Sequence, residues 1–206
     1  MSFAPFSLLI AYLLGSIPFG YLIVRLGGGD DIRERGSGNI GAANVARNAG
    51  LVAGVLTLIL DAAKGYAAVL IASRMSHPSD SVRWMMAAAI AAVLGHMFPV
   101  WLRFKGGKGV ATALGVFLPI SREAVLAAVI LWILVVAFWR YSSLGSIIAA
   151  AAMPVLVYLF YAPHHAPPEY VTGGTMLIAL LVLIKHRSNI ERLISGDEPR
   201  VNPPRL

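Results

Sequence analysis

Long apolar stretches alternate with short loops that carry most of the basic residues, and this alternation restricts the chain to a membrane fold. Seven stretches are candidate spans: 4–26, 51–73, 84–102, 110–120, 123–140, 144–161 and 171–186. Of the 206 residues, 58% are hydrophobic and only 13% are charged, whereas a soluble domain is usually about a quarter charged. We therefore expect an all-α polytopic membrane protein with seven transmembrane helices. It should form a single domain over 1–206, with a polar tail from about residue 187.

The fourth stretch, 110–120, is shorter than the roughly 20 residues that cross a bilayer core, so it must tilt or extend into the preceding loop. If all seven stretches cross, one side carries Arg74, Arg83 and Arg122, and the other carries fourteen basic residues. The positive-inside rule then predicts an outer N-terminus and a cytoplasmic C-terminus. A six-helix arrangement without the fourth stretch would move Arg122 and the loop near 140 to opposite sides, which the same count disfavours.

The first of two basic, glycine-rich loops covers residues 36–47. Its glycines and polar residues are Gly36, Ser37, Gly38, Asn39, Gly41, Asn44 and Arg47. Glycines allow turns in which successive N–H groups converge on an anion, and helix N-termini bind anions for the same reason. Arg47 adds a bidentate fork for phosphate. The alternative is a plain turn at the membrane surface, which does not need these side chains together.

The second loop covers residues 104–112 and contains Lys105, Gly106, Gly107, Lys108 and Gly109. It leads into a helix that we expect to begin near Val110. Two lysines at a helix start are unfavourable for its dipole unless an anion lies between them. The alternative is a positive-inside anchor with flexible glycines. The spacing is not that of a Walker A loop.

Three smaller features lie on the same predicted side or in an adjoining span. Ser143 and Ser146 begin the sixth stretch, where they can contact substrate or simply cap a helix. His186 and Asn189 follow the seventh and are three residues apart, one helical turn. Asp61 and Lys64 lie inside the second stretch, where charges are costly, so we expect them to pair and to support the site.

The remaining chemistry favours group transfer from an activated donor. The chain has no Cys, no His cluster at metal-ligand spacing and no G-x-S-x-G nucleophile motif, so we expect no metal and no cofactor. An acyl phosphate is a mixed anhydride with a good leaving group, and its transfer requires positioning and phosphate neutralisation. A transporter of a phosphorylated solute is the alternative, although no inverted repeat is visible.

Several motifs occur in an order that resembles a known family. They are residues 14–20, 36–47, 61–65, 95–100, 104–112 and 185–190. Together they resemble the bacterial acyl-phosphate:glycerol-3-phosphate acyltransferases, the PlsY family, over the whole chain. The resemblance implies transfer of a fatty acyl group to the 1-hydroxyl of glycerol 3-phosphate, giving lysophosphatidic acid and phosphate in phospholipid biosynthesis. It also implies a multi-pass inner-membrane enzyme with a cytoplasmic active site and a soluble partner enzyme that makes acyl phosphate. No nucleic-acid partner is expected.

The resemblance also implies residue roles. The expected catalytic residues are Ser37, Arg47, Lys108, His186 and Asn189. The first three would bind glycerol 3-phosphate, and Ser146, His186 and Asn189 would hold the acyl-phosphate end. The expected substrate-binding residues are Gly38, Asn39, Gly41, Asn44, Lys105, Gly106, Gly107, Ser143 and Ser146. One departure is Ala43, where the family usually has Thr.

Overall fold

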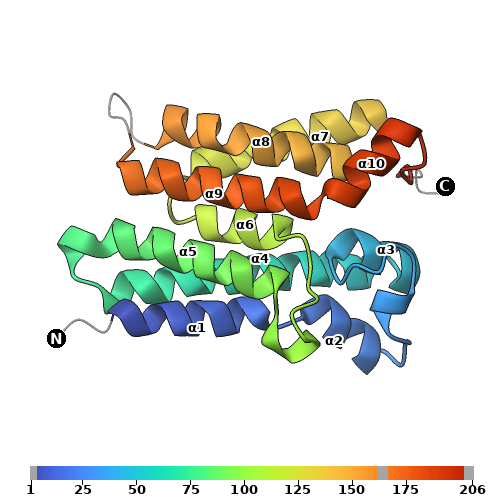
Figure 1. The fold of residues 1–206 in the computed structure, drawn as a ribbon, viewed down its shortest axis with the longest axis horizontal. Coiled ribbons are helices and arrows are strands. Elements are labelled where there is room, and N and C mark those ends of the chain that lie inside the picture. Colours follow the sequence, from blue (N-terminus) through green and yellow to red (C-terminus); the bar gives the residue numbers. More distant parts are fainter. Residues whose placement is uncertain (1–3, 162–166, 202–206) are drawn as a thin grey trace. The chain divides into compact units, whose positions relative to one another are not determined.

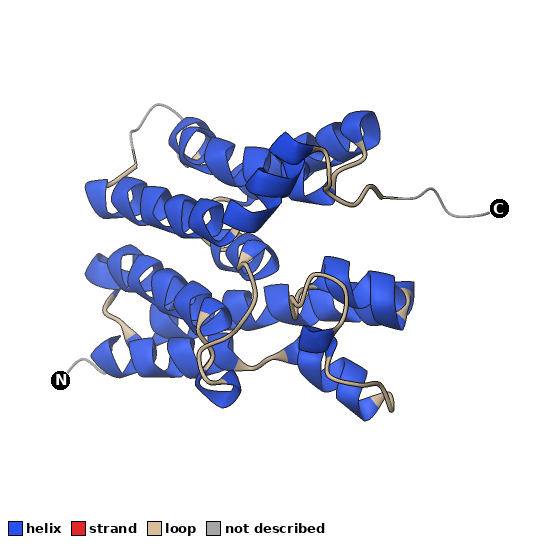
Figure 2. Cartoon of the chain, turned by 45° about the vertical axis from the view of Figure 1, so that its right-hand side comes forward, coloured by secondary structure: helices blue, strands red, loops and turns tan. Residues whose placement is uncertain are grey.

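The computed structural model describes residues 4–161 and 167–201, and every regular element within them is a helix (Figures 1 and 2). The chain divides into two compact units, 1–120 and 121–206. The first contains α1 (Ala4–Ser16), α2 (Phe19–Leu26), α3 (Ala42–Ala49), α4 (Leu51–Met75), α5 (Ser81–Met97) and α6 (Val110–Phe117), with 3₁₀ turns at Ile32–Glu34, Pro78–Asp80 and Val100–Leu102. The second contains α7 (Arg122–Trp139), α8 (Ser142–Phe160), α9 (Glu169–Lys185) and α10 (Arg187–Ser195).

Five helical segments of the described residues are long and apolar enough to cross a membrane: Ala4–Leu26, Leu51–Met75, Pro78–Leu102, Arg122–Trp139 and Ser142–Phe160. The pair α9 and α10, bent by 54° where they join, qualifies as a sixth. The expected crossing at 110–120 is not confirmed, because α6 has only eight residues. At 1.5 Å per residue such a helix is about 12 Å long.

The first span is interrupted at Ile17 and Pro18, between α1 and α2. Pro18 has no backbone N–H to donate and stands at the cap position of α2. The sequence prediction treated 4–26 as one continuous helix, and the structure corrects this. The break exposes the Ile17 carbonyl to other partners.

Small residues let the helices of the first unit approach closely. An ideal Cβ on Gly15 of α1 would lie 2.1 Å from the Ala92 carbonyl oxygen of α5, and one on Gly115 of α6 would lie 1.9 Å from the Ala62 carbonyl oxygen of α4. Neither position has room for a side chain. Such packing is typical of membrane helices, where small residues allow close backbone contact.

Both glycine-rich loops belong to the first unit and lie toward the same end of it. The C-terminal half of α5 packs on that of α1, where the Tyr12 hydroxyl donates to the Phe98 carbonyl over 2.8 Å. The segment from α5 to α6 therefore lies toward the end at which α1 leads into α2, with α3 nearby (Figure 1). In the second unit α8 packs against both α7 and α9.

Candidate active site

The first loop is organised by the side chain of Asn44, which is only 2% exposed. Its amide nitrogen lies 2.8 Å from the Asn39 carbonyl, 3.1 Å from the Arg35 carbonyl and 3.3 Å from the Ile32 carbonyl. Its amide oxygen accepts from the Ser37 backbone N–H at 3.0 Å. Asn44 therefore uses its hydrogen-bonding capacity to shape the loop.

Three backbone amides of this loop donate to acceptors within the protein. Besides the Ser37 N–H, the Gly38 N–H donates to the Arg35 carbonyl at 3.0 Å, and the Gly41 N–H donates to the Asn39 side-chain oxygen at 2.7 Å. These N–H groups cannot converge on a phosphate without giving up those bonds. Glycine is needed here for shape, because Gly36 and Gly38 have φ of 57° and 68°.

Two predicted phosphate-binding side chains lie on the surface of this loop and the helix that follows it. Ser37 is exposed, and Arg47 is exposed in the last turn of α3. Asn39 and Gly41 are partly buried beside them. The loop thus presents a hydroxyl and a guanidinium on a backbone held from behind by Asn44.

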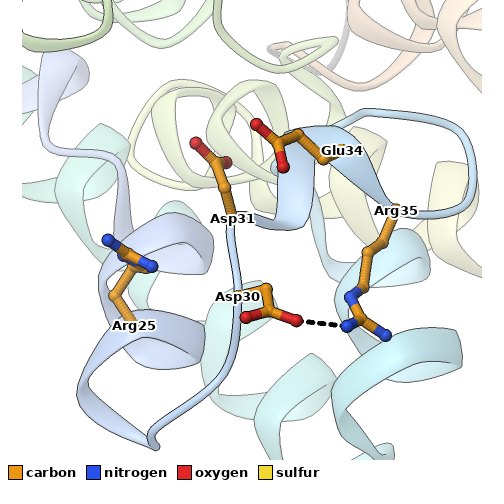
Figure 3. A pocket seen from close by; sticks show the side chains of 5 residues that line it. All are labelled: Arg25, Asp30, Asp31, Glu34 and Arg35. Carbon is orange, nitrogen blue, oxygen red and sulfur yellow. Dashed lines mark hydrogen bonds and ion pairs between the residues drawn. The ribbon is translucent and has the colours of Figure 1, made fainter.

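A charged hollow flanks this loop between α2 and α3 (Figure 3). It is lined by Arg25, Asp30, Asp31, Glu34 and Arg35, and Asp30 is paired with Arg35. Three carboxylates against two guanidinium groups make it a poor phosphate site. Asp31 accepts from Arg33 at 2.9 Å, and that hydrogen bond lowers the pKa of Asp31 to about 2.

The second loop is pressed against the end of α5. The Gly106 N–H donates to the Met97 carbonyl at 3.2 Å, and the Gly107 N–H donates to the His96 carbonyl at 3.0 Å. These two amides are therefore also used within the protein. Lys105 is exposed and Lys108 is half-buried, so two ammonium groups flank a fixed glycine pair.

The approach to this loop has an unusual backbone. Arg103 and Phe104 have φ of 51° and 62°, a left-handed conformation that non-glycine residues rarely adopt. Consecutive residues of this kind store strain, and such strain gathers at functional sites. Helix α6 then begins at Val110, as predicted.

The pairing of Asp61 and Lys64 is confirmed. The Lys64 ammonium nitrogen lies 2.7 Å from the Asp61 carboxylate, and both side chains are 2% exposed. His96 of α5 joins them, with Nδ1 at 3.6 Å from the same carboxylate oxygen. The sequence prediction did not include His96 in this cluster.

In the second unit, His186 is the residue at which α9 ends and α10 begins. It is 3% exposed, and its Nδ1 lies 2.8 Å from the Val182 carbonyl. A carbonyl can only accept, so Nδ1 carries the proton and the neutral ring has its lone pair on Nε2. The Asn189 N–H donates to the His186 carbonyl at 2.8 Å, so the two residues lie within one turn, as predicted.

Glu198 contacts Asn189, a predicted site residue, and the sequence prediction gave Glu198 no role there. Its side chain is 7% exposed and accepts from Asn189 at 2.6 Å and from Arg192 at 2.8 Å. Burial raises the pKa of Glu198, but the side chains of Ser143, Asn189 and Arg192 outweigh burial and hold the pKa below its ordinary value. The only sequence signal was Gly196, whose φ of 82° turns the tail back toward α10.

The two serines of α8 differ in their surroundings. Ser146 is 8% exposed; its hydroxyl donates to the Ser142 carbonyl at 3.0 Å and accepts from the Trp132 ring N–H at 3.3 Å. Ser143 lies close enough to Glu198 to lower its pKa. The α8 start is also where the tail docks, since the Val201 N–H donates to the Arg140 carbonyl at 2.7 Å.

Each unit therefore gathers one part of the predicted set. The first holds Ser37, Lys105 and Lys108 on two loops and Arg47 on α3. The second holds Asn189 and Ser143 beside Glu198, with His186 one helical turn from Asn189. Among residues 4–161 and 167–201, no three His, Asp or Glu side chains are grouped as metal ligands would be. Hydroxyl, amide, imidazole and cationic groups suit anion binding and proton transfer.

Comparison with known proteins places this arrangement in a family. A family model of glycerol-3-phosphate acyltransferases matches residues 5–196. Glycerol-3-phosphate acyltransferases of Syntrophotalea carbinolica and Trichlorobacter lovleyi are 53% and 52% identical to the chain, over 94% and 92% of it and 95% and 93% of their own lengths. A crystal structure of PlsY, an integral membrane glycerol 3-phosphate acyltransferase, in its glycerol 3-phosphate form is 40% identical and superposes with a TM-score of 0.88, covering 97% of this chain and 96% of that one. The chain therefore belongs to the glycerol-3-phosphate acyltransferase family.

Proposed function

We propose that the protein transfers a fatty acyl group from acyl phosphate to the 1-hydroxyl of glycerol 3-phosphate, giving lysophosphatidic acid and inorganic phosphate. The observation that carries this proposal is the pair of cationic loops in the first unit of a membrane chain from this family. Related crystal structures in glycerol 3-phosphate and lysophosphatidic acid forms agree with such a substrate and product. The family gives no support to the alternative of a solute transporter.

Glycerol 3-phosphate is assigned to the first unit. Lys108 and Arg47 supply two positive charges for a phosphate dianion, and the Ser37 hydroxyl adds a neutral donor. Lys105 is an exposed second lysine that draws the anion toward the loop. Because the N–H groups of Ser37, Gly38, Gly41, Gly106 and Gly107 are used internally, we assign most of the binding to side chains, while Gly38, Asn39, Gly41, Asn44, Gly106 and Gly107 fix the shape.

The acyl-phosphate end is assigned to the second unit. The Asn189 amide is held by Glu198, and the Ser146 hydroxyl is held by the Ser142 carbonyl of its own helix turn. Ser143 lies beside Glu198. His186 is fixed by its Nδ1 hydrogen bond to the Val182 carbonyl and lies one helical turn from Asn189. These residues orient the leaving group through polar contacts.

The chemistry needs no nucleophile from the protein. The 1-hydroxyl oxygen attacks the acyl carbonyl carbon, the bond from that carbon to the phosphate oxygen breaks, and the electron pair leaves on phosphate. The hydroxyl proton passes to a phosphate oxygen, as the resemblance to the family implies for the substrate's own phosphate. The protein contributes position and positive charge, which typically supply most of the rate enhancement in such sites.

We assign the protein to the bacterial inner membrane, with an outer N-terminus, a cytoplasmic C-terminus and a cytoplasmic active site. The short α6 then completes a crossing together with the irregular segments on either side, which are allowed at depth when protein surrounds them. If α6 did not cross, the segments after it would lie on the opposite side of the membrane. The basic residues would then be divided almost equally between the two sides. A soluble enzyme that forms acyl phosphate supplies the donor.

The orientation has a direct test because the chain contains no Cys. Single Cys variants at Ser79, Glu123 and Ser195, all exposed, are treated in intact cells with a membrane-impermeant thiol reagent. We expect Ser79→Cys and Glu123→Cys to react and Ser195→Cys to react only after permeabilisation. Protection of Glu123→Cys in intact cells would contradict the crossing at α6.

The site assignment is tested with Lys108→Ala and Arg47→Ala in purified protein, assayed for lysophosphatidic acid from palmitoyl phosphate. Each should lower the rate by about 100-fold or more, as loss of one charge-stabilising donor does elsewhere, with an unchanged melting temperature. Arg187→Ala is the matched control, since Arg187 is 86% exposed and paired with Glu191. A Lys108→Ala enzyme with the wild-type rate would refute the assignment.

A further inference from the structure

A buried cluster of three ionisable side chains lies outside the groups that face substrate in the proposed mechanism. Asp61 and Lys64 of α4 and His96 of α5 are 2%, 4% and 3% exposed. Replacing a buried ion pair by apolar residues is often neutral or stabilising, and charges inside a membrane are costly. A gain in stability therefore does not explain why three ionisable side chains are buried here. Their contacts with the two loops suggest a different role.

The first contact joins the cluster to the support of the first loop. The Lys64 ammonium donates to the Ile17 carbonyl over 2.7 Å, at the break between α1 and α2. Helix α2 then presses Gly20 against the loop, where an ideal Cβ would lie 1.9 Å from the Ile40 carbonyl oxygen. Lys64 thus fixes the start of the helix on which the first loop rests.

The second contact joins the cluster to the second loop. An ideal Cβ on Gly107 would lie only 2.0 Å from His96 Nε2, so the loop backbone rests on the imidazole edge. The His96 and Met97 carbonyls accept from Gly107 and Gly106. The ring's other nitrogen faces Asp61 at 3.6 Å. The orientation of this ring therefore sets how far the loop approaches α5, and Lys108 is the next residue.

We propose that Asp61, Lys64 and His96 form a positioning network that holds both glycine-rich loops in register for glycerol 3-phosphate. Asp61 orients Lys64 toward Ile17 and His96 toward Gly107, so one carboxylate links the supports of the two loops. None of the three touches substrate. The proposal rests on the proposed function, in which Ser37, Arg47 and Lys108 bind that phosphate.

The proposal predicts a selective kinetic defect. In the full-length enzyme, Asp61→Asn keeps the shape of the side chain and removes the charge that pairs with Lys64 and faces His96. The KM for glycerol 3-phosphate should rise about tenfold or more, the factor expected for losing one charge-assisted hydrogen bond, while the KM for palmitoyl phosphate stays unchanged. Thr175→Val is the control: Thr175 is equally buried, in α9, and its hydroxyl donates to Val171 at 2.7 Å.

A double-mutant cycle between Gly107 and His96 tests the second contact without depending on Asp61. Gly107→Ala alone should impair glycerol 3-phosphate binding, because its methyl group meets the imidazole. In the His96→Ala background that methyl has room, so Gly107→Ala should cost at least about tenfold less there, as expected for residues in direct contact. Independent effects of the two substitutions would overturn the proposal.

The two hypotheses can fail separately. If Asp61→Asn has wild-type KM values and only a lower melting temperature, the cluster serves stability alone and the proposed network is refuted. The proposed site still stands in that case, provided that Lys108→Ala remains defective. A Lys108→Ala enzyme with an unchanged KM for glycerol 3-phosphate would instead refute the proposed site.

Discussion

The Asn189 side-chain amide donates to the Glu198 carboxylate over 2.6 Å, so the tail beyond α10 folds back onto the first turn of that helix. Arg192 binds the other carboxylate oxygen at 2.8 Å. A residue from the polar tail therefore fixes a side chain assigned to the acyl-phosphate end. A side chain that binds substrate keeps its productive geometry only when neighbouring groups hold it in place, as Glu198 holds Asn189 here.

Replacing Glu198 should therefore reduce activity through Asn189. Glu198→Ala leaves Arg192 and Asn189 without their acceptor, at a cost of about 1–3 kcal/mol for a buried hydrogen-bonded group. We expect loss of lysophosphatidic acid formation and faster proteolysis of the tail after Ser195. Glu191→Gln is the matched control, because the Glu191 side chain is 61% exposed. Equal activity of the two variants would contradict this role.

Asn44→Asp should collapse the first loop although the two side chains have nearly the same size. The carboxylate cannot donate to the Asn39, Arg35 and Ile32 carbonyls, and it places a charge in a site that is 2% exposed. We expect a loss of stability of about 2–4 kcal/mol from the unsatisfied groups, measured as a lower melting temperature in detergent. Asn48→Ala removes hydrogen bonds to the Asn44 carbonyl and side-chain oxygens at 2.9 and 3.1 Å, but Asn48 is exposed, so water can replace these bonds and the effect should be smaller.

Gly20→Ala should separate α2 from the first loop. The added methyl group would lie 1.9 Å from the Ile40 carbonyl oxygen, which is backbone and cannot move aside alone. We expect a raised KM for glycerol 3-phosphate and a lower melting temperature. Gly173→Ala serves as the control, since nothing lies within 4 Å of its Cβ position. There the substitution should be neutral or should stabilise α9 by up to about 1 kcal/mol.

The stability of the first loop should depend on Asp31 in acid. Its pKa of about 2 lies below the ordinary value because Arg33 donates to the carboxylate. Its contribution is therefore present above about pH 4, the ordinary carboxyl pKa, and is lost as the pH falls toward 2. Since Arg33 is partly exposed, we expect about 1 kcal/mol or less. Melting temperatures between pH 6 and pH 2.5 should fall less for Asp31→Asn than for the wild type, whereas Asp30→Asn, at an exposed pair, should follow the wild type.

Much of the fold could be predicted from hydropathy because a membrane imposes long apolar helices. The stretch 51–73 corresponds to Leu51–Met75, and 144–161 corresponds to Ser142–Phe160. The short stretch 110–120 already indicated that the fourth helix could not cross a bilayer core by itself, and α6 has only eight residues. The break at Pro18 was harder to foresee, because the apolar residues continue there while the backbone turns.

The hydrogen bonds within the two glycine-rich loops could not be predicted from the sequence. Glycines beside Lys108 suggested amides that converge on phosphate, but Gly106 and Gly107 donate to α5 carbonyls that only the folded chain brings near. His96 and Glu198 were missed for the same reason. Both contacts depend on a turn of the chain, between α5 and α6 for His96 and after α10 for Glu198, that no motif in the sequence marks.

The most direct test is an assay of the purified protein in detergent with glycerol 3-phosphate and three parallel donors: palmitoyl phosphate, palmitoyl-CoA and palmitoyl acyl carrier protein. We predict that lysophosphatidic acid forms from palmitoyl phosphate alone, with one inorganic phosphate released for each product molecule. No product from palmitoyl phosphate, or product from palmitoyl-CoA instead, would contradict the proposed reaction.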